Sequence, residues 1–442
     1  MATQIQWSNV QSLDAALHRA RANTDCLFGA IHEDSFYERP IPERHRIIFY
    51  IGHLEAFDWN LLREHLFSLP SPTPDFDRLF AFGIDPVDGG LPADKPEDWP
   101  SLREVRQYVQ ALRAQISEAL VAGRFLEPAT GGNHSPETLL QVAIEHRLMH
   151  SETLAYMFHR LPYANKVRQS LPSAPAAPVE NDLVGIPAGT TTLGLPRTAD
   201  APFGWDNEFE STTVNVPAFR IQKYMVTNGE FLRFLEAGGY ERDEYWSVRD
   251  WQWKERSGIR HPAFWRQSDL GWLYRGMFEE LPLPENWPVY VSHAEASAYA
   301  RWSKQSLPTE AQWHRAAYAT PSEEERSYPW GPSAPGRTTG NFDFVRWDPV
   351  PVSAYPQNQS AFGVCGLLGN GWEWTSTPFA SFPGFQPFAF YPGYSANFFD
   401  GQHYVIKGGS ARTAACFLRR SFRNWFQPHY QYVYAGFRCV SE

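Results

Sequence analysis

The first 165 residues place apolar side chains at the 3.6-residue spacing of amphipathic helices. Between 101 and 120 they form one stripe, and Ser101 with Glu104 has the spacing of a capping box at the start of that stripe. A second strong start signal is Ser135–Pro136, an N-cap followed by proline at the first helical position. The other helices are expected near 12–30, 42–67 and from 135 to about 160. The pattern predicts a four-helix bundle.

From about residue 183 the pattern changes to short runs, dense turn residues and long aromatic stretches that fit neither period. We expect strands in GTTTLG, TTVNVPAFRI and HYVIKGGSA, and helices in TNGEFLRFLEAG and SHAEASAYARWSKQ. The Pro- and Ala-rich segment LPSAPAAPVEN is typical of a linker. The sequence therefore predicts an α+β multidomain protein. Its parts are a helical bundle over 1–165, a linker over 166–182, and a domain with little regular structure over 183–442.

The composition excludes several classes of protein. A chain of 442 residues is too long for one ordinary core, and 43% apolar positions are typical of globular domains. The net charge of −10 disfavours nonspecific binding of nucleic acid. Four scattered cysteines do not form a disulfide framework. No apolar run approaches a membrane span, and the first residues lack a signal-peptide pattern. We expect a cytoplasmic protein with no membrane or nucleic-acid partner.

Two histidines four residues apart, His146 and His150, lie in the last expected helix. Side chains one turn apart can reach the same point, which is why helical metal sites use this spacing. Both lie on a stripe of core-facing positions that also carries Met149. A third histidine, His53, has aromatic neighbours on one face of the second expected helix. The ordinary alternative is three core histidines with satisfied hydrogen bonds, but three inward histidines on two helices favour a metal site.

The residues alone leave the metal open. Three neutral imidazoles leave positions on an octahedral ion for a substrate and O₂, which suits Fe(II), and they also suit zinc with one water. We interpret the following five histidines as surface or loop residues: His18, His45, His134, His159 and His261.

Six motifs of the second half occur in order: YMVTNGEFLRFLEAGGY, PVYVSHAEASAYARW, LPTEAQWHRAA, GNGWEWT, KGGSA and AGFRC. Together they closely resemble the formylglycine-generating-enzyme-like, or sulfatase-modifying-factor-like, domain, whose fold is related to the C-type lectins. The resemblance covers nearly all of 183–442. The copper-binding oxidases of that superfamily use a close pair of cysteines after GGS, whereas this chain has only Cys416 there. Formylglycine-generating activity is therefore not expected.

The whole chain resembles the ergothioneine sulfoxide synthases and their relatives, the ovothiol and selenoneine synthases, in which a DinB-like bundle precedes this domain. The matching segments are GHLEAF with His53, EHRLMHSET with His146, His150 and Glu152, and SFRNWFQP followed by AGFRC. The resemblance implies non-heme Fe(II) bound by the three histidines. It also implies O₂-dependent joining of sulfur or selenium to C2 of an imidazole, usually that of hercynine, the trimethylated betaine of histidine.

The resemblance also implies substrate residues. It places Asn424 and Trp425 at the trimethylammonium end of the pocket, where an indole face suits a cation. Their alternative interpretation is aromatic packing and a turn amide. The active-site tyrosine of many members lies after WEWT, where this chain has Phe379 and Phe382. The catalytic residue is therefore unknown, and the candidate substitutes are Tyr391 and Tyr394.

Three further departures concern the donor. Met149 stands where many members have a glutamine that reaches the substrate, and Phe426 stands where many have an aspartate that binds the donor amine. The segment FDRLFAFGIDPVDGG has only Arg78 where many members carry several arginines. Without charged partners in the pocket, a zwitterionic thiol would lose its hydration with little compensation. A neutral sugar carries no charge that needs such a partner. The sequence therefore favours a selenoneine synthase that uses a selenosugar donor.

Three alternatives stay open. The first is an ergothioneine-type synthase that uses cysteine or γ-glutamylcysteine. The second is a DinB-like metal-dependent thiol transferase or hydrolase with Zn or Ni on the same histidines and no need for O₂. The third is a lectin-like binding module beside a structural bundle, which the inward histidines disfavour. Metal analysis of the purified protein separates these classes.

Overall fold

The computed structural model describes residues 7–82, 91–123, 125, 135–169, 179–198 and 201–442. The chain forms two compact units. The first comprises residues 1–169 together with Phe388–Phe390, and the second comprises 170–387 and 391–442. Most of the expected linker lies outside the described residues. Within the part of the chain that is described, no helix has both the length and the apolar character needed to cross a lipid bilayer.

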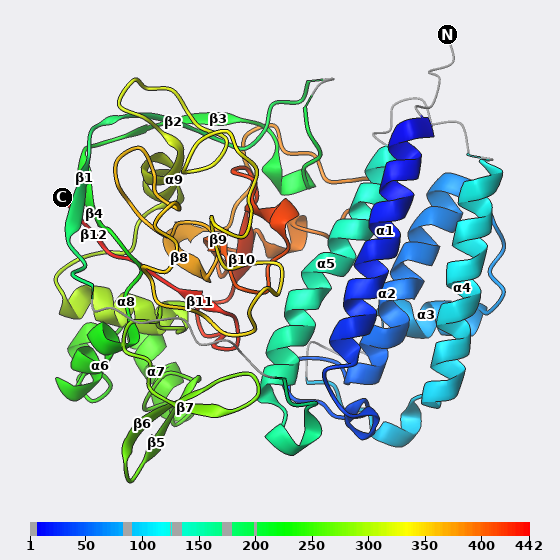
Figure 1. Ribbon diagram of the computed structural model, residues 1–442, viewed down its shortest axis with the longest axis horizontal. Helices are drawn as coiled ribbons and strands as arrows, with labels where there is room; N and C mark the ends of the chain where they lie inside the picture. The colour runs from blue at the N-terminus through cyan, green and yellow to red at the C-terminus, as the bar shows by residue number, and fades with distance from the viewer. Residues whose placement is uncertain (1–6, 83–90, 124, 126–134, 170–178, 199–200) are drawn as a thin grey trace. The chain divides into compact units, whose positions relative to one another are not determined.

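The first unit is a helical bundle (Figure 1). Its helices are α1 (Trp7–Phe28), α2 (Ile47–Leu62), α3 (Pro74–Phe82), α4 (Leu102–Ala122) and α5 (Pro136–Arg160). Helix α2 continues into a π-helical turn over Arg63–Phe67. Helix α5 packs on α1 and α2, and α2 also packs on α3 and α4. The expected bundle of four long helices is confirmed.

Local sequence sets where these helices begin. The hydroxyl of Ser101 accepts the backbone N–H of Glu104, and the Glu104 side chain accepts the backbone N–H of Ser101. Ser135 caps α5 by accepting the backbone N–H of Thr138. These bonds satisfy amides that have no partner inside the helix. The capping signals in the sequence therefore located the starts of both helices.

A cluster of charges, buried except for the half-buried Arg113, joins four helices of the bundle, and we call it the ion cluster. Its members are Arg21 (α1), Glu55 and Asp58 (α2), Arg113 (α4) and Arg147 (α5). Arg147 Nη2 lies 2.7 Å from an Asp58 oxygen and 2.9 Å from Glu55 Oε1. Burial opposes ionisation of Glu55, but the surrounding guanidinium groups outweigh burial and lower the pKa of its carboxyl. The cluster therefore ties α5 to α2 at a fixed register.

One helix of this unit was not predicted, and one expectation was wrong. Helix α3 lies in a stretch to which the sequence pattern assigned no element. His159, expected at the surface or in a loop, is fully buried near the end of α5. A stripe of period 3.6 describes a helix that packs on one side, but α5 packs against two helices and is buried on more than one face.

The second unit contains four helices and four small sheets in its described part (Figure 1). The helices are α6 (Asn228–Glu236), α7 (Val248–Arg256), α8 (His293–Trp302) and α9 (Glu310–Tyr318). The central sheet has the order β10-β9-β8-β11, formed by β8 (Gly371–Pro378), β9 (Tyr404–Gly409), β10 (Asn424–Phe426) and β11 (Ala435–Gly436). Strand β9 is antiparallel to both β8 and β10, and β11 is parallel to β8.

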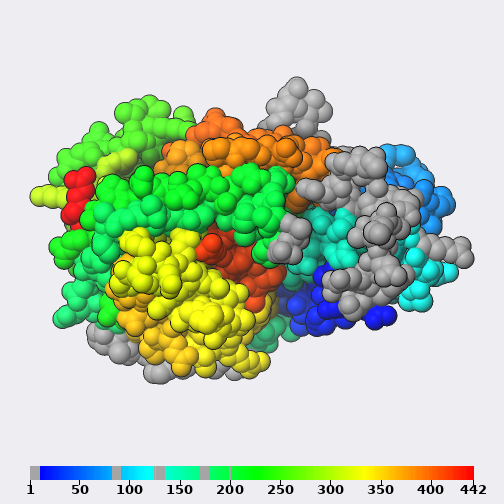
Figure 2. Space-filling view, turned by 90° about the horizontal axis from the view of Figure 1, so that it is seen from above, coloured from blue at the N-terminus to red at the C-terminus, as the bar shows by residue number. Residues whose placement is uncertain are grey.

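The remaining strands form three small antiparallel sheets. They are β1 (Leu183–Ile186), β4 (Phe219–Gln222) and β12 (Val440–Ser441); β2 (Gly189–Leu193) and β3 (Thr212–Val216); and β5 (Trp265–Ser268), β6 (Gly271–Arg275) and β7 (Glu280–Pro282). The long loop-rich stretch between α9 and β8, yellow in Figure 2, covers much of one face of this unit. The expected strands and helices α6 and α8 are confirmed, whereas α7 and α9 were not expected.

Two of the motifs identified in the sequence meet in the core of the second unit. Glu373 of GNGWEWT and Arg438 of AGFRC are both fully buried and form a bidentate pair with both distances at 2.7 Å. The Trp313 indole donates to the same carboxylate at 2.8 Å. A buried pair of this kind requires good geometry and satisfied hydrogen bonds. These motif residues therefore hold the fold together.

We predict that Glu55→Gln lowers the free energy of unfolding of the first unit by about 3–5 kcal/mol, because it leaves buried guanidinium groups without a compensating charge. Glu64→Gln is the matched control, since Glu64 pairs with Arg63 at the surface and such pairs contribute about 1 kcal/mol or less. Urea unfolding followed by far-ultraviolet circular dichroism measures both variants. Equal and small effects would contradict the role assigned to the ion cluster.

Candidate metal centre and aromatic cluster

The structure brings together the three histidines that the sequence singled out, His53 of α2 with His146 and His150 of α5, and we call them the histidine triad. One potential ligand atom from each lies within 4.8 Å of the other two. The ring centroids are 5.3 Å apart for His53 and His146, 5.0 Å for His53 and His150, and 4.6 Å for the pair on α5. The triad can thus present three nitrogens to one point.

The register between α2 and α5 explains this convergence. Arg147 is the direct neighbour of His146, and its guanidinium binds Asp58 and the backbone carbonyl of Leu54, which is next to His53. His146 is buried, whereas His150 and His53 are half-buried. The expectation that both histidines of α5 face the core therefore holds fully only for His146. His53 and His150 are therefore partly exposed, whereas His146 is covered.

Aromatic rings fix the planes of these imidazoles. Phe49 stacks on His53 with centroids 4.7 Å apart, and Phe57 stacks on His146 at 3.5 Å. Tyr50 lies against His150 at 5.7 Å. Such walls keep water away from the ring faces and leave the nitrogens as the reactive edges.

Burial keeps the triad neutral. It lowers the pKa of His53 to about 4, opposed by the hydrogen bond to the Phe80 carbonyl, and it lowers the pKa of His146 and His150 well below the usual value, helped by the neighbouring histidines. Neutral imidazole is the form that binds a metal ion. The donor set is therefore ready for a divalent ion at neutral pH.

His53 and His150 differ in the surroundings of their Nδ1 atoms. His53 Nδ1 lies 2.7 Å from the backbone oxygen of Phe80, and because a carbonyl only accepts, Nδ1 carries the proton and Nε2 keeps its lone pair. His150 Nδ1 is buried and has no hydrogen-bond partner among the described residues. A buried ring nitrogen of this kind is accounted for if a ligand binds there. Both observations fit a metal site.

The predicted substrate residues fall in two places. Met149 lies on α5 beside the triad and is half-buried, and its thioether offers no hydrogen-bond donor. The other predicted residues belong to the second unit, where several rings gather around Trp425 of β10. We call this group the aromatic cluster, and its members are Trp205, Phe379, Tyr394, Phe398 and Trp425.

Trp425 is the centre of the aromatic cluster. Its ring stacks on Phe379 with centroids 4.1 Å apart, and Tyr394 and Phe398 lie at 5.6 and 5.5 Å. Trp205 stacks on Tyr394 at 4.0 Å. Trp425 as a whole residue is half-buried, and Phe379 covers one face of its ring.

The remaining predicted residues surround this cluster. Tyr391 lies 5.7 Å from Tyr394, and burial together with Asp206 raises the pKa of its phenol. Phe382 lies under the guanidinium of Arg423 at 4.1 Å. The Asn424 side-chain oxygen accepts the backbone N–H of Trp425, the next residue of β10. Phe426 stacks in parallel on Tyr430 at 5.6 Å.

Sequence reasoning missed several participants. The Phe80 carbonyl belongs to the backbone of a helix that was not predicted, so no residue type in the sequence indicates that it binds His53. Trp205 precedes Trp425 by more than two hundred residues, and only the tertiary fold brings them into one cluster. The sequence showed abundant tryptophan but not which rings meet.

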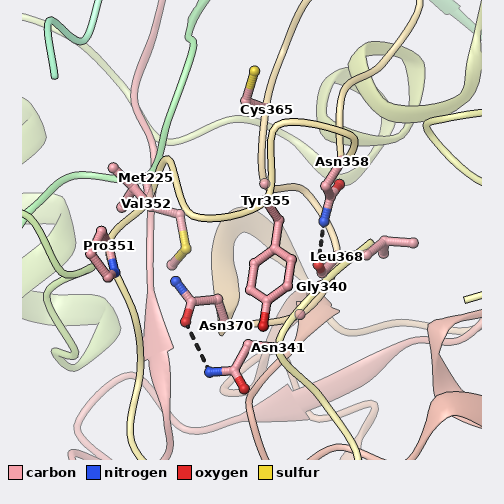
Figure 3. Close-up of a pocket in the computed structure, with 12 residues that line it drawn as sticks. Met225, Gly340, Asn341, Pro351, Val352, Tyr355, Asn358, Cys365, Leu368 and Asn370 are labelled. Atoms are coloured by element: carbon pink, nitrogen blue, oxygen red, sulfur yellow. Dashed lines mark hydrogen bonds between the residues drawn. The ribbon is translucent and has the colours of Figure 1, made fainter. Parts of the chain in front are cut away.

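A separate recess lies in the second unit, lined by residues that include Met225, Asn341, Tyr355, Cys365 and Asn370 (Figure 3). Its amides mainly tie the loops together. Asn341 donates to Asn370 at 3.3 Å, and Asn358 donates to the Leu368 carbonyl at 2.6 Å. We assign this recess to the scaffold of the second unit.

Comparison with known families also separates a helical bundle from a second domain that follows it in the chain. The model of the sulfatase-modifying factor enzyme 1-like domain matches residues 168–442, and that of the DinB superfamily matches residues 16–154. These matches define a two-domain protein in which a DinB-type helical bundle precedes a sulfatase-modifying-factor-like domain. The expected fold class is confirmed.

Three relatives indicate which family of such two-domain proteins the chain belongs to. The hercynine oxygenase of Mycolicibacterium smegmatis is 33% identical over 376 residues, which cover 83% of each chain. The hercynine oxygenase of Mycobacterium tuberculosis is 42% identical over 55% of this chain and 57% of its own length. Ergothioneine biosynthesis protein 1 of Schizosaccharomyces pombe is 30% identical over 93% of this chain. This chain spans little more than half the length of the last two relatives, 57% and 53%.

The chain belongs to the family of the hercynine oxygenases, the ergothioneine sulfoxide synthases. The family expected from the sequence motifs is therefore confirmed, and the chain is a member of a family of oxidative enzymes.

We predict that the metal-free protein loses stability as the pH falls from about 6.5 to about 4. An unfolded-chain histidine takes up a proton below about pH 6.5, whereas the folded His53 has a pKa of about 4. The unfolded state then binds more protons, so the free energy of unfolding decreases by up to about 1.4 kcal/mol per pH unit for each such group. Urea unfolding at several pH values measures this slope. His53→Asn should reduce it, and an unchanged slope would contradict the assignment.

Proposed function

We propose that this protein is a non-heme Fe(II)- and O₂-dependent enzyme that joins a chalcogen to C2 of the hercynine imidazole, and that it is a selenoneine synthase using a selenosugar as donor. The observation that carries the proposal is the histidine triad, three neutral imidazoles converging within 4.8 Å in a member of the hercynine oxygenase family. The names of the relatives support hercynine as the acceptor.

His53, His146 and His150 would hold the iron. The unshared lone pair of His53 Nε2 and the buried Nδ1 of His150 support this donor set. The ion would supply the activation of O₂ and a point at which both substrates meet. The aromatic walls around the triad would exclude water from the imidazole faces, and the substrates would enter beside the partly exposed His53 and His150.

The aromatic cluster would bind the trimethylammonium group of hercynine. Indole is the best side chain for a desolvated cation, and Trp425 is half-buried with Tyr394 and Phe398 beside it. Asn424 would orient the substrate through its side-chain NH₂ group, because its oxygen already accepts the backbone N–H of Trp425. Tyr391 and Tyr394 remain candidates for a catalytic group, and their phenols would act as proton donors.

The charges around the aromatic cluster support a neutral donor. Arg423, which lies over Phe379 and Phe382, is bound by Glu310 through contacts of 2.9 and 3.1 Å. Arg419 is paired with Glu208, with its Nε 2.9 Å from a carboxylate oxygen. These guanidinium groups already have carboxylate partners, so they would bind a donor carboxylate only at the cost of an internal pair.

Two residues that differ from those of many family members also support a neutral donor. Phe426 presents a ring stacked on Tyr430, and Met149 offers a thioether beside the triad. Arg78 pairs with Asp75, and both side chains are largely exposed. An aromatic face packs against the apolar face of a sugar, but it offers no partner to the carboxylate of an amino-acid donor.

The names of the relatives favour a second candidate, an ergothioneine-type sulfoxide synthase that uses cysteine or γ-glutamylcysteine. The match of the bundle to the DinB superfamily favours a third, a metal-dependent thiol transferase that needs no O₂. One experiment separates all three.

Iron-loaded enzyme and hercynine are mixed with equal amounts of selenosugar, cysteine and γ-glutamylcysteine, in parallel with O₂ and under strict anaerobiosis, and the products are identified by mass spectrometry. We expect a selenium adduct of hercynine to dominate. Phe426→Asp should reduce turnover of the selenosugar, because it places a charge where the sugar face would pack. His150→Ala serves as the metal-deficient control.

A sulfoxide carrying cysteine or γ-glutamylcysteine as the main product would show that the donor assignment is wrong. Thiol transfer at full rate under strict anaerobiosis would replace the oxidative function with the transferase. Selenosugar turnover that is unchanged in Phe426→Asp would remove Phe426 from the donor pocket.

A further inference from the structure

Gly52 is a glycine in the middle of α2 whose backbone conformation does not require glycine, since its φ is not positive. Alanine is the better helix former at such a position. The packing supplies the reason. A Cβ atom at Gly52 would lie 2.4–2.5 Å from the ring atoms of Phe80, far inside van der Waals contact. The absence of a side chain at Gly52 therefore lets Phe80 of α3 lie directly on α2.

Phe80 also provides the hydrogen-bond acceptor for the next residue of α2. Its carbonyl lies in the last turn of α3, where backbone oxygens have no partner inside the helix, and it accepts the Nδ1–H of His53 at 2.7 Å. The ring over Gly52 and the carbonyl at His53 belong to one residue. A side chain at position 52 that displaced the ring would therefore move the acceptor as well.

Helix α3 is itself firmly held. Asp77 accepts the Trp59 indole N–H of α2 at 3.1 Å and the Tyr108 hydroxyl of α4 at 2.7 Å. The Phe80 ring is fully buried and stacks on Tyr108 with centroids 5.6 Å apart. The carbonyl at His53 thus has a fixed place, set by contacts to both neighbouring helices.

We propose that Gly52 is a positioning residue for the metal centre: it admits Phe80, whose carbonyl fixes the tautomer and the ring orientation of His53 so that Nε2 faces the metal. The inference rests on the proposed function, because it takes the histidine triad to be the metal site. Partners that hold the second nitrogen of a histidine ligand typically change metal affinity 10- to 100-fold when they are lost. The same effect is assigned here to a residue that touches neither the metal nor the imidazole nitrogens.

The test compares five forms of the full chain: wild type, Gly52→Ala, Phe80→Leu, the double variant, and Gly185→Ala. A Cβ at Gly185 would meet nothing within 4 Å, so this variant controls for the Gly→Ala change itself. Affinity for Fe(II) is measured anaerobically by chelator competition, and the optical spectrum of the Co(II)-loaded protein reports the ligand geometry. Thermal unfolding of the metal-free forms is recorded alongside.

We expect Gly52→Ala to bind Fe(II) about 10- to 100-fold more weakly than wild type and to show an altered Co(II) spectrum. Phe80→Leu should unfold at a lower temperature but keep its metal affinity, because leucine retains the backbone carbonyl. The double variant should regain affinity, since the smaller side chain makes room for the methyl group. Gly185→Ala should match wild type in affinity and spectrum.

Wild-type affinity in Gly52→Ala, or a folded double variant as weak as Gly52→Ala, would overturn this inference and leave the proposed function standing. If Gly52→Ala did not fold, the double variant would be compared with wild type, and a folded double variant that binds Fe(II) at least about 10-fold more weakly would overturn the inference. Absence of Fe(II) binding by the wild-type protein would instead reject the proposed function.

Discussion

The ion cluster between α2 and α5 is the constraint on which the candidate metal centre depends. Arg147 reaches Asp58, Glu55 and the Leu54 carbonyl, and it sits next to His146 in the chain. A slip of α5 by one residue would break these bonds and turn the histidines away from His53. Because desolvation makes buried ion pairs weak contributors to net stability, their value here is that they specify one register.

Within this fixed register, the ring planes, the charge state and the proton position of the triad are each set by a different kind of contact. Stacked rings set the imidazole planes, burial keeps the nitrogens neutral, and the Phe80 carbonyl assigns the proton of His53. None of these contacts requires a metal ion. The bundle is thus organised in advance for three neutral nitrogen donors, which limits the reorganisation that metal binding would need.

The sequence revealed the features that depend on local spacing. The capping residues located α4 and α5, and the interval between His146 and His150 placed two candidate ligands on one helix. It did not reveal features that depend on partners from distant segments. In the sequence, charged residues such as Glu55, Asp58 and Arg147 are typical of a solvent-exposed helix face, and only the packing of other helices buries them. The Phe80 carbonyl is a backbone atom, so no side chain in the sequence predicts it. Burial of His159 was likewise invisible, because a single apolar stripe does not reveal that two helices pack on α5.

The most direct test of this account is X-ray absorption at the iron K-edge of the anaerobic Fe(II)-loaded protein. The account predicts an inner shell of nitrogen and oxygen atoms whose outer-shell scattering fits three imidazoles, and it predicts that His150→Ala no longer retains iron. A shell with sulfur, or one with the same imidazole count in wild type and His150→Ala, would show that the histidine triad is not the iron site.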